Sequence, residues 1–274
     1  MMVEALVYFF VPALVGVLIG IASGLLGIGG GTVMVPIFRL AFGMSATMST
    51  ATSLFAIIPT SISGAISHVK GKTCIPALGI AAGLGGACLS PVGVWLAQLS
   101  PDWLVMLAAA LIIGYSAINM FKKAFKLRPA GQPAAGADAA APTADDSSLS
   151  RKQLLQGAAI GLVAGLASGY VGVGGGFIMV PLMLSIIGIP MRKASGTSLI
   201  AVMILAIPGV IEQGIIGNIN YLAGIAIVIG TIPGAVIGAR LVTKVPERTL
   251  RLLFGCFLIV AAVMLVLNEV GIFG

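Results

Sequence analysis

Two glycine-rich motifs are the parts of this 274-residue sequence best suited to bind a ligand. The first glycine motif is residues 27–31 (GIGGG), and the second glycine motif is residues 172–176 (GVGGG). Each glycine costs a helix about 1 kcal/mol relative to alanine, so we expect helices to break at both motifs. No charged residue lies within 20–36 or 165–181. The chemistry available there is the binding of an anion by uncharged backbone N–H groups.

Helices are predicted to restart directly after both motifs, over 32–42 and 177–189. The N-terminal amides and the positive dipole ends of these helices would then point into the breaks. Pro36 and Pro181 fall near the first turn, where a missing N–H removes little hydrogen bonding. Glycines at every fourth position before each motif are instead typical of closely packed membrane helices. The candidate substrate-binding glycines are Gly29, Gly30, Gly31, Gly174, Gly175 and Gly176.

Hydroxyl-bearing residues follow each predicted hairpin and could add neutral donors to the same site. The candidates are Thr52 and Ser53 in one half and Thr197 and Ser198 in the other. The alternative is that these side chains cap helices or bond to backbone carbonyls, as Ser and Thr often do. Glu212 is the candidate for proton coupling, because burial can raise the pKa of a carboxyl group. Its alternative is a carboxylate in an outer loop.

The sequence does not favour an enzyme, a metal protein or a nucleic-acid-binding protein. It has a single histidine, His68, and it lacks a Ser-His-Asp set and paired carboxylates. Its three cysteines, Cys74, Cys88 and Cys256, are embedded in apolar sequence and are expected to fill the core. The net charge is +7, but the sequence contains no basic stripe with interleaved aromatic residues of the kind that binds nucleic acid. No catalytic residue, cofactor or metal site is therefore predicted.

The composition places most of the chain in lipid. Hydrophobic residues make up 59% and charged residues 8% of the sequence, and the mean hydropathy is +1.15. About 20 apolar residues span a bilayer, and the sequence contains eight apolar blocks. Two of these blocks, 5–42 and 154–189, are too long for one helix and contain the glycine motifs. The prediction is an all-α polytopic membrane protein with a glycine-broken helical hairpin and three transmembrane helices in each half.

The two halves are related by an internal repeat with an offset of 145 residues. Residues 20–36 and 165–181 are identical at 11 of 17 positions. The predicted organisation is a first transmembrane repeat over 1–125, a flexible cytoplasmic linker over 126–150 and a second transmembrane repeat over 151–274. The linker is rich in Ala, Pro, Gly and Asp, and such a segment cannot bury enough apolar surface to fold.

The distribution of Lys and Arg predicts how the halves are oriented. Basic residues flank the linker, so the linker is expected to face the cytoplasm. If each long block crosses the membrane once, eight Lys and Arg residues lie inside and seven outside. If each block returns to its starting side, 14 lie inside and only Arg39 outside. The second arrangement fits the rule and makes the halves inverted-topology repeats, with both termini periplasmic. Such repeats are typical of secondary transporters in the bacterial inner membrane.

The paired G-x-G-G-G-x-x-x-V-P patterns at 27–36 and 172–181, with the Gly-Thr-Ser-Leu sequence at 196–199, resemble the TauE/SafE sulfite exporter family. The resemblance covers nearly the whole chain except the linker. It implies transport of sulfite, sulfoacetate or a related organosulfonate, with the lipid bilayer and a small anion as partners. In the first half the pattern reads Ala-Thr-Ser-Leu at 51–54, so the halves need not contribute equally.

Three hypotheses follow from these patterns. The first is a gradient-driven exporter of a small sulfur-containing anion. The second is an importer of a similar anion, or a carrier for another solute. The third is a membrane enzyme or assembly scaffold without transport, and the shortage of buried ionisable groups disfavours the enzyme. The sequence does not fix the coupling ion, and it leaves open whether the protein forms a homo-oligomer.

Overall fold

The computed structural model describes residues 2–126 and 150–269, and these residues are almost entirely helical, with no strand. The first half comprises α1 (Met2–Leu26), α2 (Gly31–Phe42), α3 (Ala46–Lys70), α4 (Pro76–Leu99) and α5 (Asp102–Lys126). The second half comprises α6 (Arg151–Val171), α7 (Gly176–Leu182), the π-helix η1 (Met183–Ile187), α8 (Met191–Ile216), α9 (Tyr221–Leu241) and α10 (Glu247–Glu269). Most of the predicted linker, residues 127–149, lies outside the described residues.

Seven of the described helices are long and apolar enough to cross a bilayer: α3, α4, α5, α6, α8, α9 and α10. Shorter apolar helices cover Val11–Leu26, Gly31–Phe42 and Gly176–Ile187. The predicted class, an all-α polytopic membrane protein, is thereby confirmed. One detail is wrong, because Cys88 and Cys256 are exposed on the helix surfaces and do not fill the core. Apolar helix surfaces face lipid in such a protein, so an apolar environment in the sequence did not require burial.

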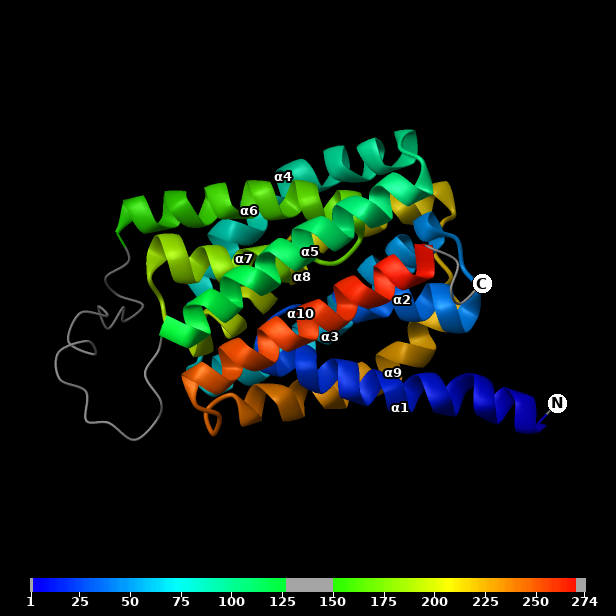
Figure 1. The fold of residues 1–274 in the computed structure, drawn as a ribbon, viewed down its shortest axis with the longest axis horizontal. Coiled ribbons are helices and arrows are strands. Elements are labelled where there is room, and N and C mark those ends of the chain that lie inside the picture. The colour runs from blue at the N-terminus through cyan, green and yellow to red at the C-terminus, as the bar shows by residue number, and fades with distance from the viewer. Residues whose placement is uncertain (1, 127–149, 270–274) are drawn as a thin grey trace.

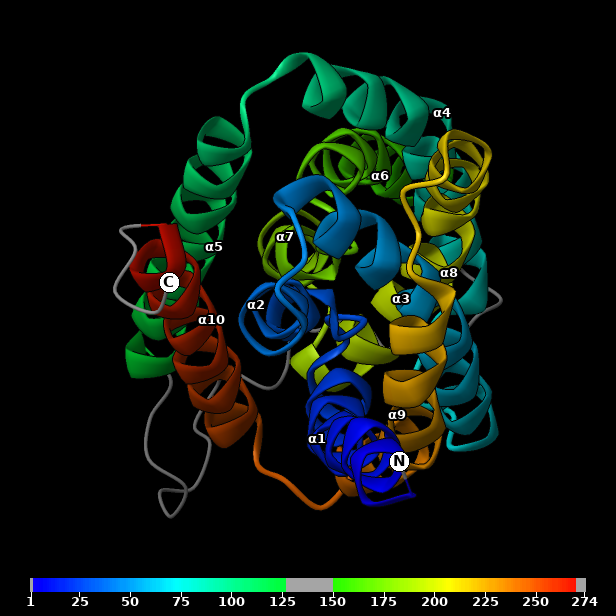
Figure 2. The ribbon, with the colours of Figure 1, turned by 90° about the vertical axis from the view of Figure 1, so that its right-hand side faces the viewer.

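The helices run between two ends of an elongated bundle (Figure 1). α1 begins and α10 finishes at one end, which we call the terminal end. α5 finishes and α6 begins at the opposite end, which we call the linker end. Viewed from the terminal end, α2 and α7 lie in the centre, with the long helices around them (Figure 2). The two short return helices therefore occupy the middle of the bundle.

The main helix pairs join one half to the other. α1 packs along α9 and α4 packs along α6, while α3 contacts α8 and α5 contacts α10. Small residues permit this contact, as the four-residue glycine spacing predicts. A Cβ atom at Gly20 would lie 2.4 Å from the Thr231 carbonyl oxygen, and one at Gly165 would lie 2.1 Å from that of Gly86. Neither position has room for a side chain.

The long central helices α3 and α8 are capped in equivalent ways. The backbone N–H of Ala46 donates to the Asp102 carboxylate (3.3 Å), and that of Met191 donates to the Glu247 carboxylate (3.1 Å). Both donors and both acceptors are separated by 145 residues. A carboxylate is favourable at a helix N-terminus, where N–H groups have no partner within the helix. These bonds fix the start of α3 beside that of α5, and the start of α8 beside that of α10.

Candidate functional site: two glycine motifs in the centre of the bundle

The helices break at the two glycine motifs, as the sequence predicts. α1 ends at Leu26 and α2 begins at Gly31, while α6 ends at Val171 and α7 begins at Gly176. The φ angles at Gly29 (+81°), Gly30 (+86°), Gly174 (+88°) and Gly175 (+68°) are left-handed. Glycine adopts this conformation readily, whereas residues with a Cβ rarely do. The sharp reversals therefore depend on the glycines themselves.

The return helices differ in detail from the prediction. Both start one residue earlier than expected, and the second ends in five π-helical residues, Met183–Ile187. Gly188 closes that segment by donating its N–H to the Met183 carbonyl (3.0 Å). Pro36 and Pro181 are each the sixth residue of their helix, so they lie in the second turn and not the first. Proline there removes the bond that its N–H would make to the carbonyl four residues earlier.

The two glycine motifs pack against each other in the centre of the molecule. A Cβ atom at Gly31 would lie 2.5 Å from the Val173 carbonyl oxygen, and one at Gly176 would lie 2.5 Å from that of Gly27. Each motif thus approaches the backbone of the other. α2 has 12 residues and is about 18 Å long, somewhat more than half of a hydrocarbon core of about 30 Å. The motifs consequently lie near the middle of the membrane-spanning bundle.

Backbone N–H groups without partners are concentrated at this meeting point. In the described structure, no hydrogen bond is made by the amides of Ile28, Gly29, Gly30, Val173 and Gly174. All five residues are buried. A buried donor without a partner costs about 1–3 kcal/mol, and more in hydrocarbon, so such groups usually meet water or a ligand.

Buried hydroxyl groups without partners lie beside the same motifs. The Cβ atoms of Ser23 and Ser168 are 3.7 and 3.4 Å from the Cβ positions that side chains at Gly30 and Gly175 would take. The Ser61 hydroxyl lies 3.4 Å from the corresponding position of Gly29. All three serines are fully buried, and their hydroxyls have no hydrogen-bond partner. They are uncharged groups available to a ligand.

Sequence reasoning missed these serines, although a signal for two of them was present. Ser23 and Ser168 occupy equivalent positions in the repeat, within the sequence Ala-Ser-Gly at 22–24 and 167–169. A repeated polar residue in an apolar stretch could have identified them. Ser61 has no such signal, because its equivalent is Ala206.

Three of the four predicted hydroxyl residues have structural hydrogen bonds. Thr52 accepts from the N–H of Asn220 (3.0 Å), and Thr197 accepts from the N–H of Ile75 (2.9 Å). Ser198 donates to the carbonyl of Gly27 (2.7 Å). These bonds agree with the alternative that the hydroxyls bond to the backbone. The bond of Ser198 nevertheless places its side chain at the first glycine motif.

Ser53 differs from its equivalent, Ser198. Its hydroxyl is buried and has no partner, whereas the Ser198 hydroxyl is engaged. The two halves thus offer different hydrogen-bonding capacity at equivalent positions.

An apolar pair of side chains packs against the glycine motifs. Ile57 lies against Gly31 and Gly174, and Val202 lies against Gly29. Ile57 and Val202 are also equivalent in the repeat and are fully buried. Both glycine motifs are therefore buried beneath apolar side chains in the described structure.

Glu212 lies in α8, four residues before the helix ends, and not in a loop. Its side chain is half-buried, and one carboxylate oxygen is buried without a hydrogen-bond partner. The loop alternative is therefore wrong. Its role in proton coupling stays a prediction.

Among the described residues, seven long apolar helices and two helical hairpins broken at buried glycine motifs define this protein as a polytopic helical membrane protein. The chain belongs to the sulfite exporter TauE/SafE family, because the family model matches residues 12–265. The match includes both glycine motifs and all helices from α2 to α9.

Curated relatives carry transporter names. The chain is 28% identical to the probable membrane transporter protein YunE of Bacillus subtilis, over 97% of this chain and 99% of that protein. It is 29% identical to a probable membrane transporter protein of Haemophilus influenzae, over 93% and 97% of the two chains. No solved structure matches the chain significantly. The family and these names indicate a membrane transporter, not an enzyme.

Proposed function

We propose that this protein exports a small sulfur-containing anion, such as sulfite, sulfoacetate or a related organosulfonate, by alternating access. The observation that carries the proposal is the meeting of the two glycine motifs, with buried N–H and hydroxyl donors that lack partners. Both the family and the names of the relatives support transport. The substrate class comes from the family description and from the chemistry of the donors.

Uncharged donors suit a carrier that must release its substrate. Each unpaired buried donor carries a cost of about 1–3 kcal/mol, which an oxyanion offsets by accepting hydrogen bonds. The start of α2 adds the positive end of a helix dipole. A fixed lysine would bind an anion more strongly but would also oppose its release. The absence of charge within 20–36 and 165–181 is therefore consistent with transport.

The alternating-access part of the proposal rests on inverted repeats. Several pairs of contacts recur at equivalent positions, including α1–α9 with α6–α4 and the capping of α3 with that of α8. α1 begins at the terminal end and α6 at the linker end (Figure 1). Exchange of the two halves' conformations would then open one central site to opposite sides of the membrane. Ile57 and Val202 must separate from the glycines in each open state.

The proposed orientation places the linker end in the cytoplasm of a bacterium and the termini in the periplasm. The loops and helix ends with Lys70, Lys72, Arg192, Lys193, Arg240 and Lys244 belong to this end, together with those flanking the linker. Arg39 lies near the end of α2, on the opposite side. Lys and Arg accumulate on the cytoplasmic side of inner-membrane proteins. A basic cytoplasmic face also raises the local concentration of anions, which favours export.

Flux into proteoliposomes tests this function. Purified protein is reconstituted, and uptake of radiolabelled sulfite and sulfoacetate is followed with imposed pH gradients of either direction. We expect saturable anion flux that depends on the protein, with net movement from the cytoplasmic to the periplasmic side. Flux of neither anion above that of protein-free vesicles would refute the substrate class, whereas flux in the reverse direction would identify an importer.

Orientation is tested separately by cysteine accessibility in whole cells. Cysteines placed at Arg192 and Lys244, in a background without the three native cysteines, should resist labelling by a membrane-impermeant maleimide until the membrane is permeabilised. Labelling in intact cells would contradict the proposed orientation.

A further inference from the structure

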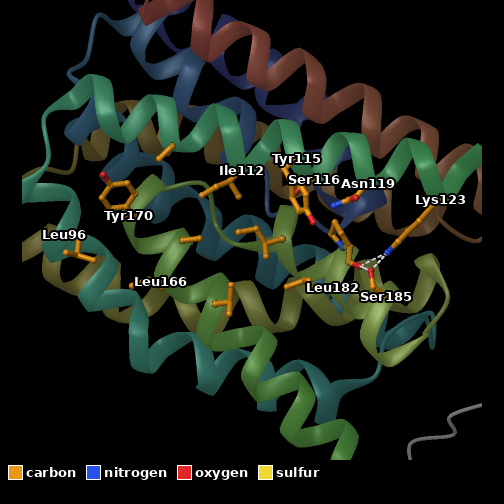
Figure 3. Close-up of a pocket in the computed structure, with 15 residues that line it drawn as sticks. Leu96, Ile112, Tyr115, Ser116, Asn119, Lys123, Leu166, Tyr170, Leu182 and Ser185 are labelled. Atoms are coloured by element: carbon orange, nitrogen blue, oxygen red, sulfur yellow. Dashed lines mark hydrogen bonds between the residues drawn. The ribbon is translucent and has the colours of Figure 1, made fainter.

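A groove runs along one flank of the bundle (Figure 3). It has a volume of about 840 Å³ and lies between α5, α6 and α7. Apolar side chains line most of it, including Ile112, Leu166 and Leu182. On α5 it extends from Ala108 to Lys123, which is about 22 Å along the helix axis. Tyr115 and Val163 on its rim are exposed, so the groove opens onto the lipid-facing surface.

Asn119, Lys123 and Ser185 lie toward the linker end of the groove, whereas the Tyr170 hydroxyl lies toward its other end and donates to Ser100 (3.0 Å). Lys123 donates to the Pro181 carbonyl (3.0 Å) and to the Ser185 hydroxyl, and Asn119 lies one turn away on α5 (Figure 3). No carboxylate of the described residues pairs with Lys123. Arg251 of α10 lies close enough for its charge to act on that of Lys123. The result is a half-buried ammonium group with a free donor and no compensating anion.

Lys123 is held at the junction between α7 and the π-helical segment. The wider hydrogen-bonding pattern of this segment and the preceding proline disturb the normal bonding of the second return helix. The Pro181 carbonyl accepts from Lys123 and from the Ser185 hydroxyl (2.6 Å). Lys123 thereby joins α5 to the end of the second hairpin.

The equivalent positions in the other half carry no such group. Counted 145 residues away, Lys123 corresponds to the uncharged Asn268, Asn119 to Met264 and Ser185 to Leu40. The polar groove is consequently a property of one half and not of the repeat. A substrate site built equally from both halves would have similar residues in each half, and this groove does not.

We propose that the groove binds an anionic phospholipid of the membrane, with its phosphate at Lys123 and an acyl chain along the apolar floor toward Leu166. Three observations support this occupant. The groove opens sideways to lipid, its length exceeds half of a hydrocarbon core of about 30 Å, and its one uncompensated cation lies at the end where other basic residues meet the membrane surface. None of the residues lining this groove belongs to the proposed central anion site, and the proposal does not depend on the transported solute.

Native mass spectrometry of the full chain with added phosphatidylglycerol or phosphatidylcholine tests the proposal. We expect one phosphatidylglycerol to remain bound to the wild type and to raise its melting temperature, with phosphatidylcholine bound more weakly. Lys123→Gln should weaken phosphatidylglycerol binding roughly fivefold, since one cation near the surface contributes on that scale. Lys122→Gln is the matched control, because Lys122 is exposed, adjacent on α5 and outside the groove.

A second variant keeps the test valid if Lys123→Gln folds poorly. Ala167→Phe fills the apolar floor without touching the charge, and it should also reduce phosphatidylglycerol binding. Equal binding of phosphatidylglycerol by wild type, Lys123→Gln and Ala167→Phe would overturn the proposal. Displacement of the lipid by millimolar inorganic phosphate would overturn it as well, by identifying a site for a free anion.

Discussion

The glycine motifs and the polar groove represent two different uses of the same repeated fold. At the glycine motifs, most of the important residues occur in pairs: Ser23 with Ser168, Ile57 with Val202, and each glycine with its equivalent; Ser61, whose equivalent is Ala206, is an exception. In the groove, the charged Lys123 corresponds to an uncharged Asn at position 268, and the polar Asn119 and Ser185 correspond to Met and Leu at positions 264 and 40. Residues that serve the proposed exchange of conformations between the halves occur in both repeats. Residues that form a site in one half need to occur in that half only.

The paired glycine motifs predict the largest effect of a single substitution. Gly30→Val and Gly175→Val should each abolish anion flux in proteoliposomes, because both positions have a left-handed φ and a side chain would contact Met34 or the Ala164 carbonyl at 3.0 Å. Gly114→Val is the control, since a Cβ there meets nothing within 4 Å. Normal anion flux in both Gly30→Val and Gly175→Val would show that the glycine motifs are not required for transport.

The paired serines should give a smaller but equal effect in the two halves. Ser23→Ala and Ser168→Ala each remove a buried hydroxyl that has no partner within the protein. A hydrogen bond to a charged group is worth about 1.5–3 kcal/mol, so the KM for the anion should rise roughly tenfold or more, with the melting temperature unchanged. A rise in KM for only one variant would break the proposed equivalence of the halves at this site.

A substitution of Glu212 tests whether the coupling of transport to protons depends on a residue of one half only, in contrast to the glycine motifs, which occur in both halves. Glu212→Gln keeps the size of the side chain but cannot take up a proton. If Glu212 couples transport to protons, flux in the variant should lose its dependence on an imposed pH gradient while flux without a gradient stays within about threefold of wild type. A retained pH-gradient response would assign coupling elsewhere.

The smallest expected effect concerns Ser53 and Ser198, which are equivalent in sequence but not in structure. Ser198→Ala removes the bond to the Gly27 carbonyl and should destabilise the protein by about 1 kcal/mol in detergent. Ser53→Ala removes no internal bond and should leave the melting temperature unchanged. Thermal unfolding of both variants measures the difference, and equal destabilisation would contradict the asymmetry.

The sequence alone determined the membrane class, the places where the hairpins break and the internal repeat. Apolar length, consecutive glycines and self-similarity are local signals, and they do not need the neighbours of a residue to be known. Membership of the sulfite exporter TauE/SafE family, expected from the doubled motif, is confirmed over residues 12–265.

Other features were decided only by the tertiary structure. The sequence could not distinguish Ser53 from Ser198, because a hydroxyl is free or engaged according to the helix packed beside it. It also did not identify Ile57 and Val202 as the side chains closing the motifs, since they resemble any other core residue. In the sequence, Lys123 is simply one of the basic residues near the linker, and its contact with the Pro181 carbonyl depends on the packing of α5 beside α7. Long-range packing, and not local pattern, assigns these roles.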